Sequence, residues 1–229
     1  MSMLASGIIT RTRIILNDAD GVRWLDAELI AWLNDAQRVI ALVRPDASVS
    51  TSVVTMVTGT KQTIPTDGLR LLDVVRNINA DGSGGRVVRN VDRDVMDTQN
   101  INWHSDTPVL VSKNYIYDNR NPKYFYVYPP ATTATQLEIL YSKNPTDCVD
   151  ATSTLGIPEI YADPLLNYVL YRAYAKDAEF AQNQQLSASY LQIFQGMLGI
   201  KTQKDAAYSP DLNSKGASPN PGALQMGGV

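Results

Sequence analysis

The spacing of the apolar residues changes twice along this chain of 229 residues. Apolar residues recur every three or four positions in residues 4–43 and again in residues 158–199, which is the period of an amphipathic helix. Between them, residues 50–142 are rich in β-branched and aromatic residues that alternate as in half-buried strands. This order predicts an α+β fold, with N- and C-terminal helices packed as a bundle, a central antiparallel β-sheet or small barrel, and an extended C-terminal tail.

The changes of pattern divide the chain into four segments. We expect residues 1–49 to supply the N-terminal helices, residues 50–145 to form the β-rich domain, residues 146–202 to complete the bundle as a helical hairpin, and residues 203–229 to form the tail. Local signals mark the helix ends. Asp26 can cap the second helix, the Arg44-Pro45 step ends it, and the last helix is expected to end near Gly199.

Turn residues divide the middle of the chain into candidate hairpins. A Thr58-Gly59 turn is expected to join residues 50–57 to a return strand at residues 62–64, and the glycine-rich residues 80–85 to join residues 69–78 to 86–91. The later strands are expected at residues 108–112, 115–117, 123–128 and 136–142, with a short helix capped by Asp92 before them and a stop at Pro129-Pro130.

Composition excludes several classes of protein. Lys and Arg number 20 against 23 Asp and Glu, so a net charge of −3 provides no long-range attraction to phosphate backbones. No run of about 20 apolar residues could span a bilayer, and the N-terminus has no basic-then-apolar signal arrangement. Cys148 is the single cysteine, so no internal disulfide can form. We expect a protein that is kept in the cytoplasm and does not read nucleic-acid sequence.

Candidate catalytic and metal-binding residues are few. His104 is the single histidine, which disfavours histidine triads and histidine-rich zinc sites, although Asp106 could orient it as a general base. Cys148 lies near Asp147 and Asp150, whose charges would raise its pKa and oppose a reactive thiolate. Asp92, Asp94 and Asp97 lack the glycine and glutamate of a calcium loop, and Gly82-Ser83-Gly84-Gly85 lacks a phosphate loop's lysine. We therefore predict no enzyme, no cofactor and no metal site.

Tyrosines gather in the second half of the β-rich segment. In Lys123-Tyr124-Phe125-Tyr126-Val127-Tyr128, strand alternation places Phe125 and Val127 on one face and Tyr124, Tyr126 and Tyr128 on the other, with Tyr115 and Tyr117 nearby in sequence. Tyrosine provides large contact area at small entropic cost, so these three could contact a subunit or the tail machinery, or bind carbohydrate. They could equally cover one side of a sheet at the edge of the core.

In the C-terminal segment, residues 203–229, the apolar residues have no regular spacing. Prolines and glycines interrupt it, while spaced apolar residues stand in a polar background, as in segments that fold onto a partner. The residues expected to dock are Tyr208, Pro210, Leu212, Leu224 and Met226.

Several stretches resemble the head-to-tail adaptor proteins of short-tailed phages, also called tail tubular protein A-like or phage adaptor proteins. The resemblance covers most of the chain and contains no catalytic signature. The stretches that carry it are Trp24-Leu25-Asp26-Ala27-Glu28-Leu29-Ile30-Ala31-Trp32-Leu33-Asn34-Asp35-Ala36-Gln37, Arg44-Pro45-Asp46-Ala47, Leu69-Arg70-Leu71-Leu72-Asp73-Val74, Asn121-Pro122 with the tyrosine strand and Pro129-Pro130, and residues 166–179.

The resemblance implies a structural protein of the virion neck or tail that is assembled in the host cytoplasm. Its partners would be itself, in a ring of twelve copies, together with the portal protein, bound through the C-terminal arm, and the tail nozzle protein. DNA would pass through the channel during genome ejection without sequence-specific binding. The alternative from the residues alone is a carbohydrate-binding module that uses the tyrosine face.

Overall fold

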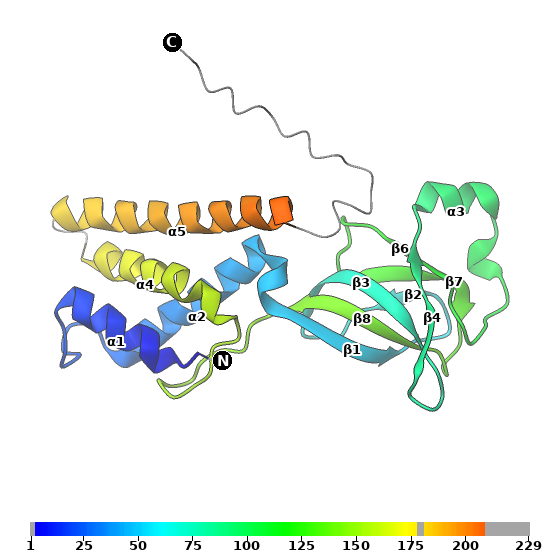
Figure 1. Ribbon diagram of the computed structural model, residues 1–229, viewed down its shortest axis with the longest axis horizontal. Coiled ribbons are helices and arrows are strands. Elements are labelled where there is room, and N and C mark those ends of the chain that lie inside the picture. The colour runs from blue at the N-terminus through cyan, green and yellow to red at the C-terminus, as the bar shows by residue number, and fades with distance from the viewer. Residues whose placement is uncertain (1–2, 178–180, 209–229) are drawn as a thin grey trace, which may run out of the picture.

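The protein consists of a helical part and a β part that lie end to end (Figure 1). The computed structural model describes residues 3–177 and 181–208. The chain passes from the helices to the strands after Val43 and returns after Lys143, so the N- and C-terminal helices meet in one part. The expected α+β fold, with the terminal helices in a bundle, is confirmed.

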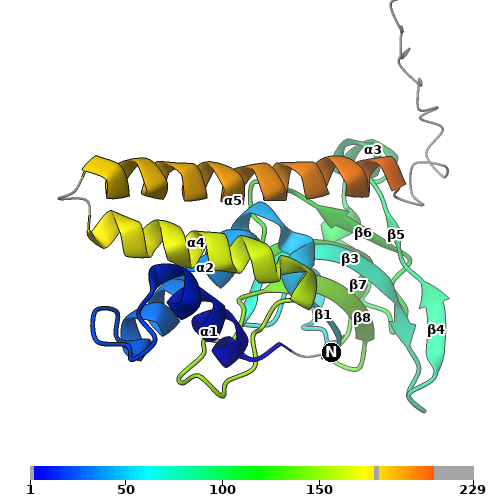
Figure 2. The same cartoon turned by 60° about the vertical axis from the view of Figure 1, so that its left-hand side comes forward.

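Four helices form the bundle, and Figure 2 shows α4 and α5 side by side over α1 and α2. They are α1 (Ala5–Leu16), α2 (Asp26–Val43), α4 (Ala162–Lys176) and α5 (Ala181–Tyr208), with the 3-10 turn η3 (Glu159–Tyr161) before α4. Buried apolar residues at three- and four-residue spacing form their shared core. That core includes Ile8, Leu29, Leu33, Ile40, Leu165, Val169, Leu170, Phe194 and Leu198.

The helix ends agree only in part with the sequence signals. The second helix ends at Val43, before Arg44 and the 3-10 turn η1 (Pro45–Ser48), as expected. Asp26 does not cap it, because its carboxylate forms an ion pair with Arg13 of α1 instead. The last helix continues to Tyr208 rather than ending near Gly199, since no proline or turn residue interrupts the helix formers between Lys201 and Ala207.

Two four-stranded sheets form the β part. The first has the order β1 (Val49–Thr55), β8 (Gln136–Lys143), β3 (Gly68–Ile78) and β4 (Gly84–Val87). The second has the order β2 (Gly59–Thr63), β7 (Tyr124–Ala131), β6 (Asn114–Tyr117) and β5 (Arg89–Asn90). All neighbouring strands are antiparallel except the parallel pair of β5 and β6.

A second core lies between the two sheets. Phe125 and Val127 from β7 and Leu137 and Ile139 from β8 are fully buried there, which confirms the alternation expected for both strands. Outside the second sheet, α3 (Arg93–Gln99) and the 3-10 turn η2 (Trp103–Ser105) cover its other face. Asp92 caps α3 as expected, by accepting a hydrogen bond from the backbone N–H of Asp94 at 3.0 Å.

Three expectations about the strands are wrong. Residues 50–57 and 62–64 do not form a hairpin, because β1 pairs with β8 and β2 pairs with β7, so the chain crosses between the sheets at residues 56–58. Pro129 and Pro130 do not end β7, because its carbonyls at Tyr128 and Pro130 still accept hydrogen bonds from Lys113 and Val109. Residues 108–112 contribute only an isolated bridge, at Val109. The hairpin of β3 and β4 is confirmed.

Candidate assembly surfaces

Polar residues of α2 fix the segment that returns from the β part to the bundle. The side chain of Asn34 accepts a hydrogen bond from the backbone N–H of Cys148 at 2.8 Å and donates to its carbonyl at 2.9 Å. One turn further along, Gln37 Oε1 accepts from the N–H of Gly156 at 2.7 Å. Arg38 adds an exposed ion pair with Asp147 at 2.6 Å. These bonds fix the return segment against α2, while other backbone groups of the same segment bond to residues 3–6 at the start of the chain.

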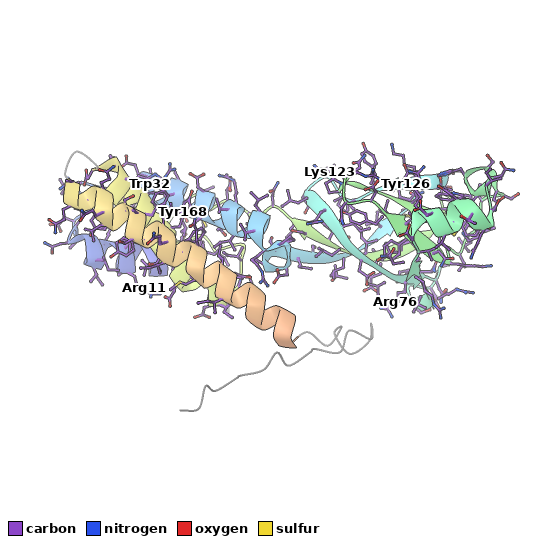
Figure 3. All side chains as sticks on the ribbon, turned by 90° about the horizontal axis from the view of Figure 1, so that it is seen from above. Arg11, Trp32, Arg76, Lys123, Tyr126 and Tyr168 are labelled. Carbon is purple, nitrogen blue, oxygen red and sulfur yellow. The ribbon has the colours of Figure 1, made fainter. Side chains whose placement is uncertain are left out.

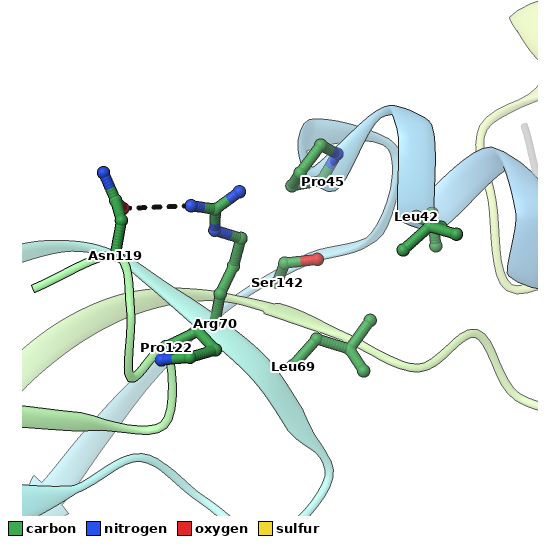
Figure 4. Close-up of a pocket in the computed structure, with 8 residues that line it drawn as sticks. Leu42, Pro45, Leu69, Arg70, Asn119, Pro122 and Ser142 are labelled. Atoms are coloured by element: carbon green, nitrogen blue, oxygen red, sulfur yellow. Dashed lines mark hydrogen bonds between the residues drawn. The ribbon is translucent and has the colours of Figure 1, made fainter.

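A cleft of about 310 Å³ lies where the bundle meets the first sheet (Figure 4). Leu42 and Pro45 lie on one side and Leu69 and Pro122 on the other, so most of its wall is apolar. The guanidinium of Arg70 at its rim donates to the side chain of Asn119 at 3.1 Å. Because Leu42 is 78% exposed, this cleft leaves a large apolar side chain open to a partner.

The tyrosines of β7 pack against the protein's own aromatic cluster. Trp103 of η2 is 1% exposed and meets the rings of Tyr126 and Tyr128 edge-on, at centroid distances of 6.0 and 6.4 Å. Tyr124 lies further along the strand, with the ammonium of Lys61 4.2 Å from its ring centroid. Figure 3 shows Tyr126 within the β part, far from the bundle residues Trp32 and Tyr168. Tyr126 and Tyr128 are thus partly buried against this cluster, and a role for the three tyrosines in a subunit contact or in carbohydrate binding stays a prediction.

The two remaining tyrosines face the other side of the sheet. Tyr115 is 5% exposed within the core between the sheets, and Tyr117 packs against the same core. The hydroxyl of Tyr115 donates to Asp73 of β3 at 2.8 Å, and burial together with this bond raises the pKa of the tyrosine. Tyr115 and Tyr117 thus hold the two sheets together instead of joining one tyrosine face.

The structure does not bring His104 and Asp106 together as a catalytic pair. His104 Nδ1 lies 2.8 Å from the hydroxyl of Thr60, and its ring stacks on Trp103 at a centroid distance of 3.6 Å. The Asp106 carboxylate instead accepts from Asn100 at 2.8 Å and from the hydroxyl of Tyr128 at 3.1 Å. Both residues serve to fix the loop that covers the second sheet.

Cys148 is a buried thiol beneath the return segment. It is 3% exposed, and burial, which is the largest cause, raises its pKa, while the charges of Asp147 and Asp150 act in the same direction. The direction expected from the sequence is confirmed, although burial outweighs the two carboxylates. Among the residues that the structure describes, no group of histidine, cysteine and carboxylate side chains is arranged to hold a metal ion.

Most of the expected docking residues lie outside the described residues. Pro210, Leu212, Leu224 and Met226 belong to residues 209–229, and Tyr208 is the last residue of α5. The sequence interpretation missed two surfaces, namely the junction cleft and the free edge of β1. The absence of any charged residue in residues 49–55 was the signal for the second.

No helix in the described part of the chain is long and apolar enough to cross a membrane. The sequence matches the family described as SU10 adaptor protein over residues 3–214, which includes both parts of the fold. A search of curated proteins finds no significant match to the chain.

Proposed function

Because this chain belongs to the SU10 adaptor protein family, we propose that it forms the ring that joins the portal to the tail nozzle of a phage virion. Membership of this family makes it a structural component of the virion that oligomerises and interacts with portal and tail proteins. We further propose that twelve copies close the ring, that the ring forms in the host cytoplasm, and that it continues the channel through which the genome is ejected.

The family match over residues 3–214 is the observation that carries the proposal, since it spans the bundle, the two sheets and all of α5. The chemistry of the molecule agrees with a structural role. His104, Asp106 and Cys148 are each occupied with packing or hydrogen bonds, and a net charge of −3 provides no strong hold on passing DNA.

The tail supplies the proposed contact with the portal. After Tyr208 a further 21 residues follow, which could reach about 70 Å if extended at roughly 3.3 Å each. We assign portal binding to Tyr208, Pro210, Leu212, Leu224 and Met226, whose apolar side chains would anchor an otherwise polar segment.

Mixing the purified protein with its portal and measuring complex mass by mass photometry tests this function. The full chain should form a complex, and a variant that ends at Tyr208 should remain folded but fail to bind. A full chain that leaves the portal uncomplexed would refute the proposal, and equal binding by the shortened chain would remove the tail from it.

A further inference from the structure

Strand β1 is an unprotected sheet edge. Among residues 3–177 and 181–208 it pairs only with β8, in a register that runs without a bulge from Val49 to Thr55. Its seven residues, Val49-Ser50-Thr51-Ser52-Val53-Val54-Thr55, contain no charge and no proline. Natural proteins usually blunt such an edge with charge, proline, a bulge or a cover, because an open edge is a template for another chain.

The other free edges of the described residues are each blunted. β2 has a bulge between Gly59 and Lys61 and the charge of Lys61, and β5 is two residues long with Arg89 as one of them. β4 has only four residues, with a register shift opposite Arg76 and Ile78. Within the part of the chain described, only β1 offers a long and uncharged edge.

The hydrogen bonds of β8 show which backbone groups of β1 are open. The N–H of Met56 donates to the carbonyl of Thr135, which lies just before β8. Because neighbouring residues of an antiparallel strand point their backbone groups in opposite directions, Thr51, Val53 and Thr55 direct theirs away from β8. The side chains of Val49, Thr51, Val53 and Thr55 are all exposed on the outer face of the sheet.

Strand β4, at the opposite edge of the same sheet, also directs backbone N–H and carbonyl groups away from the sheet. The N–H of Val88 donates to the carbonyl of Val75 in β3, so the neighbouring Val87 directs its backbone groups to the free edge of β4. Val87 is opposite Arg76, whose ion pair with Glu138 places both on the outer face. Val87 is 58% exposed and Val53 is 52% exposed. Bonded neighbours in a sheet point their side chains to the same face, and these two valines meet that requirement.

We propose that β1 of one copy pairs with β4 of the next copy, so that the first sheet continues from subunit to subunit. The contact is head-to-tail, because the two edges differ, and such contacts form a ring when the rotation from one copy to the next closes. This pairing rests on the proposed function, which requires a ring. A second copy is the occupant because the family oligomerises, and β4 is favoured over β2 because it is the opposite edge of the same sheet and presents the exposed Val87 on the same face as Val53.

Disulfide cross-linking of the double variant Val53→Cys with Val87→Cys tests the pairing in the assembled full chain. Oxidation should produce a ladder of linked subunits on a non-reducing gel, and each single variant should remain monomeric on the gel. Val53→Cys with Ile101→Cys is the matched control, since Ile101 is 86% exposed and lies beyond α3. Dimers from Val53→Cys alone would overturn the proposal in favour of symmetric β1 pairing, and an unlinked double variant would overturn it outright.

A backbone variant keeps the test independent of the cysteines. Thr51→Pro removes an N–H that β8 does not use, so the monomer should fold while oligomers are lost, and Thr51→Val should assemble normally. Assembly of Thr51→Pro at wild-type level would contradict the pairing. If complexes with portal form but the double variant does not cross-link, only the pairing fails. If wild-type protein forms no complex with portal, the proposed function fails first.

Discussion

The side-chain amide of Asn34 and the backbone of Cys148 form a reciprocal pair of hydrogen bonds, at 2.8 and 2.9 Å, between α2 and the segment that returns from the sheets. Both residues are at least nine-tenths buried. The pair therefore fixes the return segment against α2, beside the backbone bonds that the same segment makes with residues 3–6.

Replacing Asn34 should therefore be costly. Asn34→Leu leaves the N–H and the carbonyl of Cys148 buried without partners, and we expect a loss of about 2–4 kcal/mol in the free energy of unfolding. Urea denaturation measures this loss. Asp35→Ala on the same helix removes only an exposed ion pair with Arg38 and should cost less than about 1 kcal/mol. Equal losses in the two variants would contradict the role assigned to Asn34.

Chemical labelling reports on the same junction. Because Cys148 is buried and its pKa is raised, native protein at pH 8 should react with iodoacetamide about tenfold or more slowly than unfolded protein. Asn34→Leu should speed the native reaction by loosening the return segment. Native labelling as fast as that of the unfolded chain would show that the thiol is open.

Variants of Tyr126 can show whether this tyrosine stabilises the fold or binds a ligand. Tyr126→Ala removes a ring that meets Trp103 and His104, and should lower the free energy of unfolding by about 1–3 kcal/mol. Tyr126→Phe keeps the ring and should be nearly neutral in the same thermal or urea unfolding experiment. If Tyr126→Ala were fully stable and instead lost binding to a glycan array, the carbohydrate-binding interpretation would regain its support.

Protonation of Asp18 at low pH should destabilise the loop between α1 and α2. Its carboxylate accepts hydrogen bonds from the N–H groups of Trp24, Val22 and Arg23 and pairs with Arg13, and these interactions, led by the bond from Trp24, lower its pKa. Stabilisation by a lowered pKa is present above the unfolded value of about 3.9 and is lost as the pH falls through the folded value.

Asp18→Asn should thus lower the melting temperature by roughly 2–4 °C at pH 7. The difference from wild type should begin to shrink below about pH 4 and vanish once the pH has fallen through the lowered pKa of Asp18 in the folded protein, where both side chains are neutral. Thermal unfolding followed by circular dichroism across this range measures it, with the exposed Asp20→Asn as control. A difference that is constant down to pH 2 would exclude the proposed titration.

The sequence predicted local features well because their signals are local. The stripe Leu29, Leu33, Ala36 and Ile40 and the alternation of Phe125 with Val127 depend only on the period of one element, and all six are buried as expected. Val43, the last residue expected in the stripe, is 53% exposed because α2 ends there. Strand partners depend on distant segments instead. The partner of β1 is β8, not the adjacent β2, and nothing in the Thr58-Gly59 turn distinguishes a hairpin from a crossing between sheets.

The candidate site residues likewise depend on contacts with distant segments, which the sequence did not predict. Strand alternation alone predicts an open face at Tyr126 and Tyr128. In the structure, Trp103, more than twenty residues earlier in the sequence, packs against both rings. His104 and Asp106 are close in sequence, yet each turns to a different partner, Thr60 and Asn100, because the 3-10 turn separates their side chains. For the candidate site, the sequence supported two expectations, namely the raised pKa of Cys148 and the assembly properties implied by the family resemblance.

Electron cryomicroscopy of the full chain mixed with its portal tests the central claim most directly. Viewed along the portal axis, the protein should appear as a closed twelvefold ring with an open centre, stacked on the portal and lost when the chain ends at Tyr208. Portal particles without an added ring, at protein concentrations where the full chain is in excess, would contradict the account.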